Sequence, residues 1–503
     1  MLYQWPFDAD DEHAVALAAS AQEARPRFRG VTLPAGLQQL LQASLGVRLV
    51  LPDHSGYARA RRVFNPAFDP FPSGIAFCNS ENDVALCLQG VRAHNFPFRV
   101  RASGHSFAGY SSADDVLVID VSALNSIQID GGQRLVTVGA GCKLKPLQDS
   151  LTAQALQLPL GNGIIAVGGF MQGAGYGSTA RADGMNADSV LEVRIMLGDG
   201  QIVTASEKKN HDLWWAVRGA TGGNFGVLLT VTYRALARVA PSSRTLWWRL
   251  DQNAGRANAA GAIMNLQSIL ARAPSEFMGQ ADIRYWPDDP NDLSRSPWLM
   301  IAASLLGSER DLDALLHPMF GSGETKFTGF PPQRLDPFVR HARFVSGLQL
   351  EYWRSLVDDF LDNSNLYSTL TMDCMGGAIN SYPLEKSAFV HRDSTFNAYV
   401  TGFWIKGDQQ DKQKVETYLR GWSKLIAPFW NNHVFQNFPY QDVPDYRANY
   451  WGAAFPALLA VKEKYDPTRL FTFPQAIEPG LADPGPPTWP PQVVQWLKKP
   501  IEP

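Results

Sequence analysis

The sequence predicts an α+β protein with a loop-rich first half and a second half of long strands. From about Ile75 to Tyr233, short β-branched runs bounded by Gly, Asn and Asp alternate with runs whose apolar residues have helical spacing. From about Ser242 to Tyr440, longer runs rich in Trp and Tyr alternate with helical stretches, which predicts a large sheet flanked by helices. At 503 residues, the chain is too long for one ordinary core, so we expect two or three subdomains.

The expected elements of the first half follow from local patterns. Residues 36–46 predict a helix, and "SENDVALCLQGVRAHN" predicts another, with Ser80 as its N-cap. "KLKPLQDSLTAQAL", residues 143–156, predicts a third helix. Strands are expected at residues 96–102, 116–121 and 135–141, where β-branched side chains dominate.

The second half continues in the same way. Strands are expected within "TLWWRL", "DIRYWP", "WLMIAASLL" and "NAYVTGFWI", and helices within "AIMNLQSILARAP" and "KVETYLRGWSKLI". Residues 449–471 then predict one amphipathic helix, ended by the Asp466–Pro467 turn. The last residues are rich in proline, and we expect them to lie extended over the surface.

Composition argues against several classes of protein. A net charge of −3 provides no electrostatic footprint for nucleic acid or an anionic membrane. No run approaches the ~18 apolar residues of a membrane span, and the acidic N-terminus does not resemble a secretory signal, so we expect a cytoplasmic protein. The four cysteines lack the spacing of metal ligands, so no metal is expected; free buried thiols are favoured over a disulfide.

Three glycine-rich runs are the candidate ligand-binding loops: "RASGHSFAG", Gly161 to Val190, and Trp214 to Leu228. Glycine lets the backbone approach a ligand closely, and successive N–H groups can then hold a pyrophosphate. Tight turns without a ligand are the plain alternative. None of the runs opens a βαβ unit, so the Rossmann fingerprint is absent. His105 lies in the first run between two expected strands, where an ordinary loop histidine is the alternative to a functional one.

The segment "RASGHSFAGYSSADDVLVIDVSALNSIQID" resembles the flavin-attachment segment of the vanillyl-alcohol oxidase (PCMH-type FAD-binding) superfamily. More narrowly, it is similar to berberine bridge enzyme-like oxidases. The resemblance continues in order through residues 50–75, 167–190, 212–228 and 450–477, and it covers about residues 46 to 478. Such an ordered set is specific for fold and cofactor, whereas the middle of the chain matches least.

The resemblance implies a domain organisation. A PCMH-type FAD-binding domain of two α+β subdomains would span residues 46–238, after an N-terminal extension of residues 1–45. A substrate-binding domain with a large antiparallel sheet flanked by helices would span 239–440. Residues 441–480 would return to the FAD domain, and residues 481–503 would form a proline-rich tail.

The resemblance also implies FAD, bonded covalently from a ring nitrogen of His105 to the 8α-methyl carbon of the flavin. Many relatives have a second link from a cysteine, but Asn162 stands at that place in this chain, so we expect one link only. The other expected cofactor-binding residues are Arg101, Ser103, Gly104, Ser106, Gly109, Gly168, Gly169, Gly173, Gly175, Asn224, Gly226, Val227 and Tyr450.

For activity, the resemblance implies an oxidase acting on a C–OH or activated C–H group of a small cyclic metabolite. Hydride would pass to flavin N5, and O₂ would be reduced to H₂O₂. Ile165 stands where relatives control oxygen access, and it leans slightly to an oxidase. A dehydrogenase with another acceptor, an oligosaccharide oxidase and a flavin-holding scaffold without turnover remain open. A monomer or homodimer is expected, with a small-molecule substrate as partner.

A catalytic base must reach the substrate hydroxyl, and the resemblance leaves the identity of this base open. Relatives place a tyrosine in an "NY" pair where this chain has Phe438. Tyr440 is therefore expected to take over, unless the mechanism differs. Asp373 resembles an aspartate that polarises an active-site tyrosine, although a turn-capping role is equally open. Tyr399 is expected on the substrate side.

Overall fold

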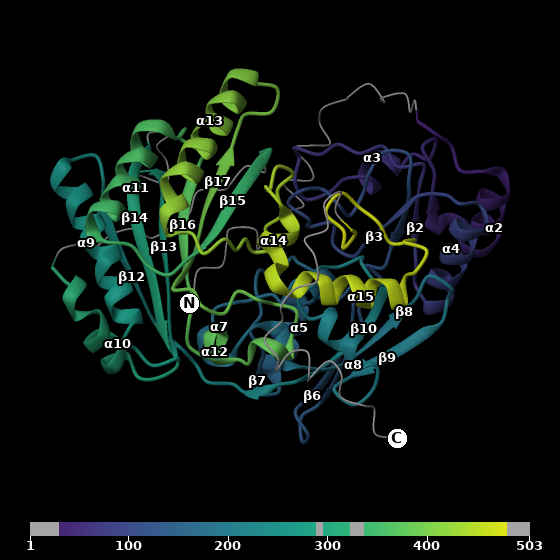
Figure 1. Ribbon diagram of the computed structural model, residues 1–503, viewed down its shortest axis with the longest axis horizontal. Helices are drawn as coiled ribbons and strands as arrows, with labels where there is room; N and C mark the ends of the chain where they lie inside the picture. The colour runs from purple at the N-terminus through teal and green to yellow at the C-terminus, as the bar shows by residue number, and fades with distance from the viewer. Residues whose placement is uncertain (1–29, 288–294, 322–335, 480–503) are drawn as a thin grey trace.

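The computed structural model describes residues 30–287, 295–321 and 336–479, and it confirms the α+β class. The proline-rich tail and most of the N-terminal extension lie outside the described residues. Figure 1 shows a large sheet with helices along its outer face at one end of the molecule and two smaller α+β units at the other end. The yellow helix α14 (Tyr446–Trp451) lies between these parts, and α15 (Phe455–Tyr465) runs along the α+β units.

The first α+β unit holds a four-stranded sheet of order β1-β2-β4-β3, in which only β1 is antiparallel to its neighbour. The helix α4 covers it and begins at the predicted cap, where Ser80 accepts a hydrogen bond from the Asp83 N–H group. The elements are α2 (Ala35–Leu45), β1 (Leu49–Val50), α3 (Tyr57–Ala60), β2 (Gly74–Phe77), α4 (Glu81–Ala93), β3 (Phe98–Arg101) and β4 (Leu117–Asp120).

The second unit holds a five-stranded antiparallel sheet of order β5-β6-β10-β8-β9. The elements are β5 (Ile127–Asp130), β6 (Leu135–Gly139), α5 (Leu144–Ala153), β7 (Leu156–Gln157), α6 (Val167–Gln172), α7 (Ala180–Asp183), β8 (Val190–Met196), β9 (Ile202–Ser206), α8 (His211–Ala216), β10 (Val227–Arg234) and β11 (Leu236–Ala237). Thus the expected strands and helices of the first half are confirmed, with ends moved by a few residues.

The large sheet is antiparallel, with the order β12-β14-β13-β16-β17-β15. Its strands are β12 (Ser242–Arg249), β13 (Phe277–Pro287), β14 (Arg295–Leu305), β15 (Phe338–Val345), β16 (Thr369–Cys374) and β17 (Phe396–Phe403). The helices are α9 (Asn253–Leu270), α10 (Glu309–Leu316), α11 (Leu350–Asn363), α12 (Ala378–Ser381) and α13 (Gln409–Ile426). Figure 1 shows α9, α11 and α13 on the outer face, which leaves the other face toward the α+β units.

The single helix expected in residues 449–471 is wrong. The chain forms α14 (Tyr446–Trp451) and α15 (Phe455–Tyr465), separated by a short 3₁₀ turn. Gly452 has a φ of +48°, a conformation that ends a helix and that glycine adopts without strain. The break turns α15 back along the second α+β unit, where Lys462 donates to the Asn224 carbonyl oxygen at 2.6 Å.

Two further expectations can be compared with the described residues. All four cysteines are buried and free, as expected, and the sulfurs of Cys78 and Cys87 lie 3.8 Å apart. Among the described residues, no helix combines the length and apolar character needed to cross a bilayer.

Candidate active site

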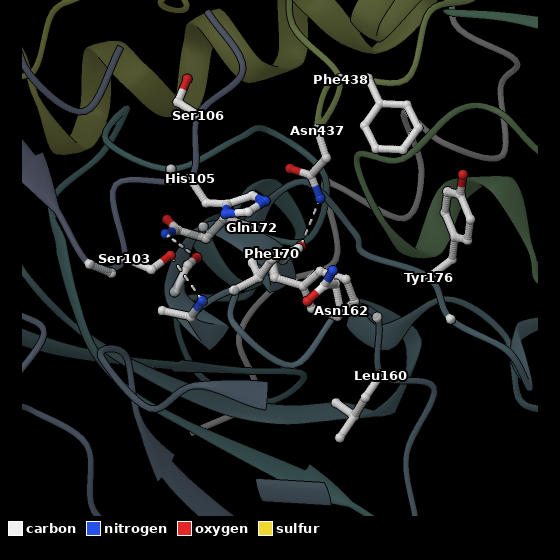
Figure 2. Close-up of a pocket in the computed structure, with 18 of the residues that line it drawn as sticks. Ser103, His105, Ser106, Leu160, Asn162, Phe170, Gln172, Tyr176, Asn437 and Phe438 are labelled. Carbon is white, nitrogen blue, oxygen red and sulfur yellow. Dashed lines mark hydrogen bonds between the residues drawn. The ribbon is translucent and has the colours of Figure 1, made fainter. Parts of the chain in front are cut away.

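A cavity of about 770 Å³ lies where the two α+β units meet the inner face of the large sheet. All three glycine-rich runs contribute to its lining, together with strands β13, β15, β16 and β17. The loop after β3 supplies His105, and Figure 2 shows this histidine near Ser103 and Gln172, with Tyr176 and Phe438 on another side of the site. The cavity therefore joins the predicted cofactor loops to the predicted substrate sheet.

The imidazole of His105 is held in an apolar corner of this cavity. Gly104 precedes it with a φ of +69°, which favours glycine and turns the chain toward the cavity. The imidazole stacks on Phe64, with ring centres 3.6 Å apart. Burial and, secondarily, the positive charge of Arg340 lower the pKa of His105 to about 3. The imidazole is therefore neutral at neutral pH and keeps a lone pair available for bonding.

The backbone around His105 offers hydrogen-bond donors. Within the described part of the chain, the N–H groups of residues 103–106, Gly222 and Gly223 donate to no other protein group. Gly104 is buried and the other five residues are half-buried along the cavity. A run of such unpaired N–H groups suits a phosphate. At Gly169, an added Cβ would meet no atom within 4 Å, because the position opens into the cavity. These features fit an FAD molecule.

Most of the expected cofactor residues line this cavity, and the structure brings them together. They are Ser103, Gly104, His105, Ser106, Gly168, Gly169, Gly226 and Tyr450. Asn162 and Ile165 line it as well, and the Asn162 side chain accepts a hydrogen bond from the Ile164 N–H group at 3.1 Å.

Other expected cofactor residues lie outside the described lining. Arg101 forms a buried ion pair with Asp120 at 2.5 Å. Asn224 accepts a hydrogen bond from the Ile477 N–H group at 2.8 Å, which ties down the C-terminal segment. The Val227 side chain belongs to the core of the first α+β unit. These three side chains stabilise the glycine-rich runs and do not line the cavity.

Three expected glycines also lie outside the lining, and each is needed for close packing. An added Cβ would come within 2.7 Å of the Phe68 ring at Gly109, and within 2.6 Å of the Phe170 ring at Gly175. At Gly173, it would lie 1.9 Å from Oδ1 of Asn437. Glycine is therefore needed at these three positions for close packing between chain segments, not for contact with the cavity.

The sheet side of the cavity carries a polar cluster centred on Asp373. Gln280, Asp373 and Asn397 face one another across β13, β16 and β17, so their side chains lie on one face. Gln280 donates to Oδ1 of Asp373 at 2.6 Å. Tyr399, 2% exposed, also lines this side. Burial raises the pKa of Asp373 above its usual range, although hydrogen bonds and Arg340 oppose the shift.

Tyr176, which the sequence pattern did not single out, completes this cluster. Its hydroxyl donates to Oδ2 of Asp373 at 2.5 Å and accepts a hydrogen bond from Asn397 at 3.0 Å. Tyr176 lies inside the glycine run "GAGYGS", and glycines flank it on both sides. A lone tyrosine amid glycines that pack closely was the available signal.

The structure does not bring Tyr440 to the cavity. Tyr440 stacks on His341, with ring centres 4.1 Å apart. Side chains alternate along β15, so His341 lies on the face opposite Arg340, which lines the cavity. Phe438 does line the cavity, 6.3 Å from the Tyr176 ring and 5.2 Å from the Tyr399 ring.

Comparison with known proteins agrees with this architecture. A family model described as FAD binding domain matches residues 72–206, and one described as berberine and berberine like matches residues 434–478. The FAD-linked oxidoreductase YgaK of Bacillus subtilis is 26% identical over 86% of this chain and 97% of its own length. Chitooligosaccharide oxidase of Gibberella zeae is 26% identical, over 82% of this chain and 88% of its own.

The solved structure of BBE-like 1 from Physcomitrella patens superposes with a TM-score of 0.77 at 25% identity. The match covers 88% of this chain and 99% of that chain. Fold, cofactor loops and sequence relatives thus lead to one conclusion. The chain is a berberine bridge enzyme-like flavoprotein with the PCMH-type fold, and it is an FAD-linked oxidoreductase.

Proposed function

We propose that this protein is an oxidase that converts a C–OH or activated C–H group of a small cyclic metabolite, with O₂ as electron acceptor and H₂O₂ as product. One observation carries the proposal. A neutral imidazole, His105, lines the same cavity as the carboxyl group of Asp373 and the hydroxyl groups of Tyr176 and Tyr399. Such a site can hold a cofactor at one side and remove a hydroxyl proton at the other.

His105 would carry the flavin through one bond to its 8α carbon, since an unprotonated ring nitrogen is the form that can make this bond. The free N–H groups of residues 103–106 would hold the pyrophosphate. Asn162 stands at the place of a second, cysteinyl link and cannot supply a thiolate. When bound, the flavin would accept a hydride from the substrate and pass two electrons to oxygen.

On the substrate side, Asp373 would polarise an active-site tyrosine and Tyr399 would face the substrate. Both line the cavity from neighbouring strands. Tyr440 receives no role in the chemistry, because its ring lies against His341. Ile165 lines the cavity at the position that the resemblance links to oxygen access, where isoleucine slightly favours an oxidase. A dehydrogenase stays the alternative on this point. A cytoplasmic location and a monomeric or homodimeric state stay predictions.

A carbohydrate oxidase is the second candidate. Gln280 lines the cavity beside Asp373, and its side-chain amide suits a substrate with several hydroxyl groups. The relative named chitooligosaccharide oxidase matches 82% of this chain. Asn162 leaves His105 as the one proposed covalent attachment of FAD. A sugar oxidase would therefore also have to work with FAD attached through a single bond.

The test uses the purified holoprotein and a panel of aromatic alcohols, alicyclic alcohols and sugars. Under anaerobic conditions, bleaching of the flavin absorbance identifies a substrate. Air is then admitted, and flavin reoxidation and H₂O₂ are measured. Rapid reoxidation with one H₂O₂ per flavin supports the oxidase, while slow reoxidation that an added quinone accelerates supports the dehydrogenase. A flavin that no member of the panel reduces would contradict alcohol oxidation and support the scaffold.

A further inference from the structure

We propose that Tyr176 is the catalytic residue that takes the hydroxyl proton of the substrate and passes its own proton to Asp373. This inference rests on the proposed oxidation of an alcohol and deepens it, since it names the group at which the proton is removed. It assigns to a glycine-rich loop of the cofactor domain the task that the resemblance places at residue 438, which is phenylalanine in this chain.

The geometry around the Tyr176 hydroxyl is that of a proton relay. The oxygen donates to Oδ2 of Asp373 at 2.5 Å and accepts from the Asn397 amide at 3.0 Å. Gln280 holds the other carboxylate oxygen of Asp373 at 2.6 Å. Both Tyr176 and Asp373 line the cavity, so a substrate hydroxyl could approach the remaining side of the Tyr176 oxygen.

The backbone that carries Tyr176 is unusual and tightly packed. Ala174 and Gly175 have φ values of +73° and +58°, and Ala174 is a residue that rarely adopts such a conformation. An added Cβ on Gly177 would lie 1.8 Å from the Leu160 carbonyl oxygen. Strained backbone persists where the surroundings fix it, and it is common at functional sites. In this loop it turns the tyrosine ring toward the sheet.

The charges support the direction of proton transfer. Burial, followed by the charge of Asp373, raises the pKa of Tyr176 well above its usual value, so the hydroxyl is protonated at rest. Burial also raises the pKa of Asp373, which makes its carboxylate a stronger proton acceptor. Tyr176 therefore cannot act as a resting tyrosinate and needs Asp373 to receive its proton.

The substrate O–H bond breaks and its proton bonds to the Tyr176 oxygen, while the Tyr176 proton moves to Oδ2 of Asp373. The electron pair of the substrate C–H bond would leave as a hydride, for which bound FAD would be the acceptor. The alcohol would then become a carbonyl, and no reagent besides FAD would be needed.

Phe438 offers a direct way to test this assignment. Its ring lies 6.3 Å from the Tyr176 ring and lines the same cavity, and Figure 2 shows the two on the same side of the site. A hydroxyl introduced by Phe438→Tyr would enter the space beside Tyr176 and Tyr399. The chain therefore allows removal of the proposed group and its replacement from a neighbouring position.

The kinetic test measures anaerobic flavin reduction by benzyl alcohol and by D-glucose. Tyr176→Phe should slow reduction about 100-fold or more, because a positioned base contributes ~10²–10⁴ in rate. Tyr176→Phe combined with Phe438→Tyr should recover at least about one tenth of the lost rate. Tyr285→Phe is the matched control, since Tyr285 lies on the opposite face of β13 and bonds to the Leu361 carbonyl oxygen. Unchanged reduction in Tyr176→Phe would overturn the proposal.

A second measurement needs no turnover. In protein labelled with ¹³C at aspartate Cγ, the Asp373 signal is assigned by its loss in Asp373→Asn and then titrated. Because the hydrogen bond from Tyr176 lowers the pKa of Asp373, that pKa should rise in Tyr176→Phe and fall again when Phe438→Tyr is added. An unchanged titration would overturn the proton relay. If neither alcohol reduces the wild-type flavin, the alcohol proposal fails, and this titration still decides the relay.

Discussion

The guanidinium carbon of Arg340 lies 4.5 Å from the centre of the Phe438 ring. The same carbon lies 4.5 Å from the Tyr399 ring centre and 4.6 Å from that of Phe107. Its Nε donates to the Thr401 hydroxyl at 2.8 Å, which fixes the side chain. A desolvated cation over aromatic faces is attracted by about 2 kcal/mol or more. Phe438, in place of a tyrosine, thus forms part of a cage around a positive charge.

Arg340→Gln should raise the pKa of Asp373, because the positive charge of Arg340 favours the carboxylate. A carboxylate that must be ionised to accept a proton then becomes active only at higher pH. The acidic limb of the profile of flavin-reduction rate against pH should therefore move to higher pH. Arg340→Lys keeps the charge and should leave the limb close to its wild-type position. A limb that stays in place in Arg340→Gln would show that Arg340 does not act on Asp373.

Lys462→Met should destabilise the protein by about 3–5 kcal/mol, because it leaves a buried carboxylate unpaired. Lys462 and Asp466 are each 1% exposed, and their charged atoms lie 2.7 Å apart. Lys464→Met serves as the control. Its ammonium group also pairs with an aspartate, at 2.6 Å from Asp212, but its side chain is 55% exposed. That change should cost only ~0–1 kcal/mol. Chemical denaturation of both variants measures the difference, and equal losses would contradict the importance of the buried pair.

Stability should fall as pH drops below about 6.5. Burial lowers the pKa of His341 to about 3 and that of His391 well below its usual value, so the folded protein keeps both neutral. The unfolded chain takes up protons from pH 6.5 downward, and each histidine then lowers the free energy of unfolding by up to ~1.4 kcal/mol per pH unit. His391→Gln should make the slope shallower, because it removes one of these buried neutral histidines. Denaturation curves between pH 7.5 and 5 measure the slopes of the wild type and of His391→Gln, and equal slopes would contradict a neutral His391 in the folded protein.

Two glycines of one loop should respond differently to alanine. Gly173→Ala should lower the thermal unfolding temperature, since its Cβ would lie 1.9 Å from Oδ1 of Asn437. Gly169→Ala should leave the unfolding temperature of flavin-free protein unchanged but reduce flavin content, since its Cβ would project into the cavity. Unfolding temperature and absorbance at 450 nm test the pair. Normal flavin content in Gly169→Ala would place the cofactor elsewhere.

The fold could be predicted because its elements have strong local signals. Ser80 caps α4 as expected, and the Trp-rich runs become β12, β13 and β14. The break at Gly452 was missed because helical spacing continues across it. Nothing in the apolar pattern of that segment shows that one residue adopts a φ of +48°.

Some residues of the candidate site could be predicted from the sequence and others could not. Residues around His105 were found because their sequence resembles a known attachment segment. Tyr176 was missed because its direction depends on the positive φ values of Ala174 and Gly175, which the sequence does not specify. Tyr440 was expected to take the place of the tyrosine missing at position 438. The two positions are only two residues apart, but Phe438 lines the cavity and Tyr440 lies on the far side of β15.

Acid denaturation shows whether FAD is bonded covalently to His105 and to no other residue. Purified protein is denatured in acid, and the yellow fluorescent flavin is followed on the polypeptide, in wild type and in His105→Ala. We expect the flavin to remain with wild type and to be released from the variant. Release from wild type would contradict the link. Retention in both would show a second attachment, so Asn162 would not mark the absence of one.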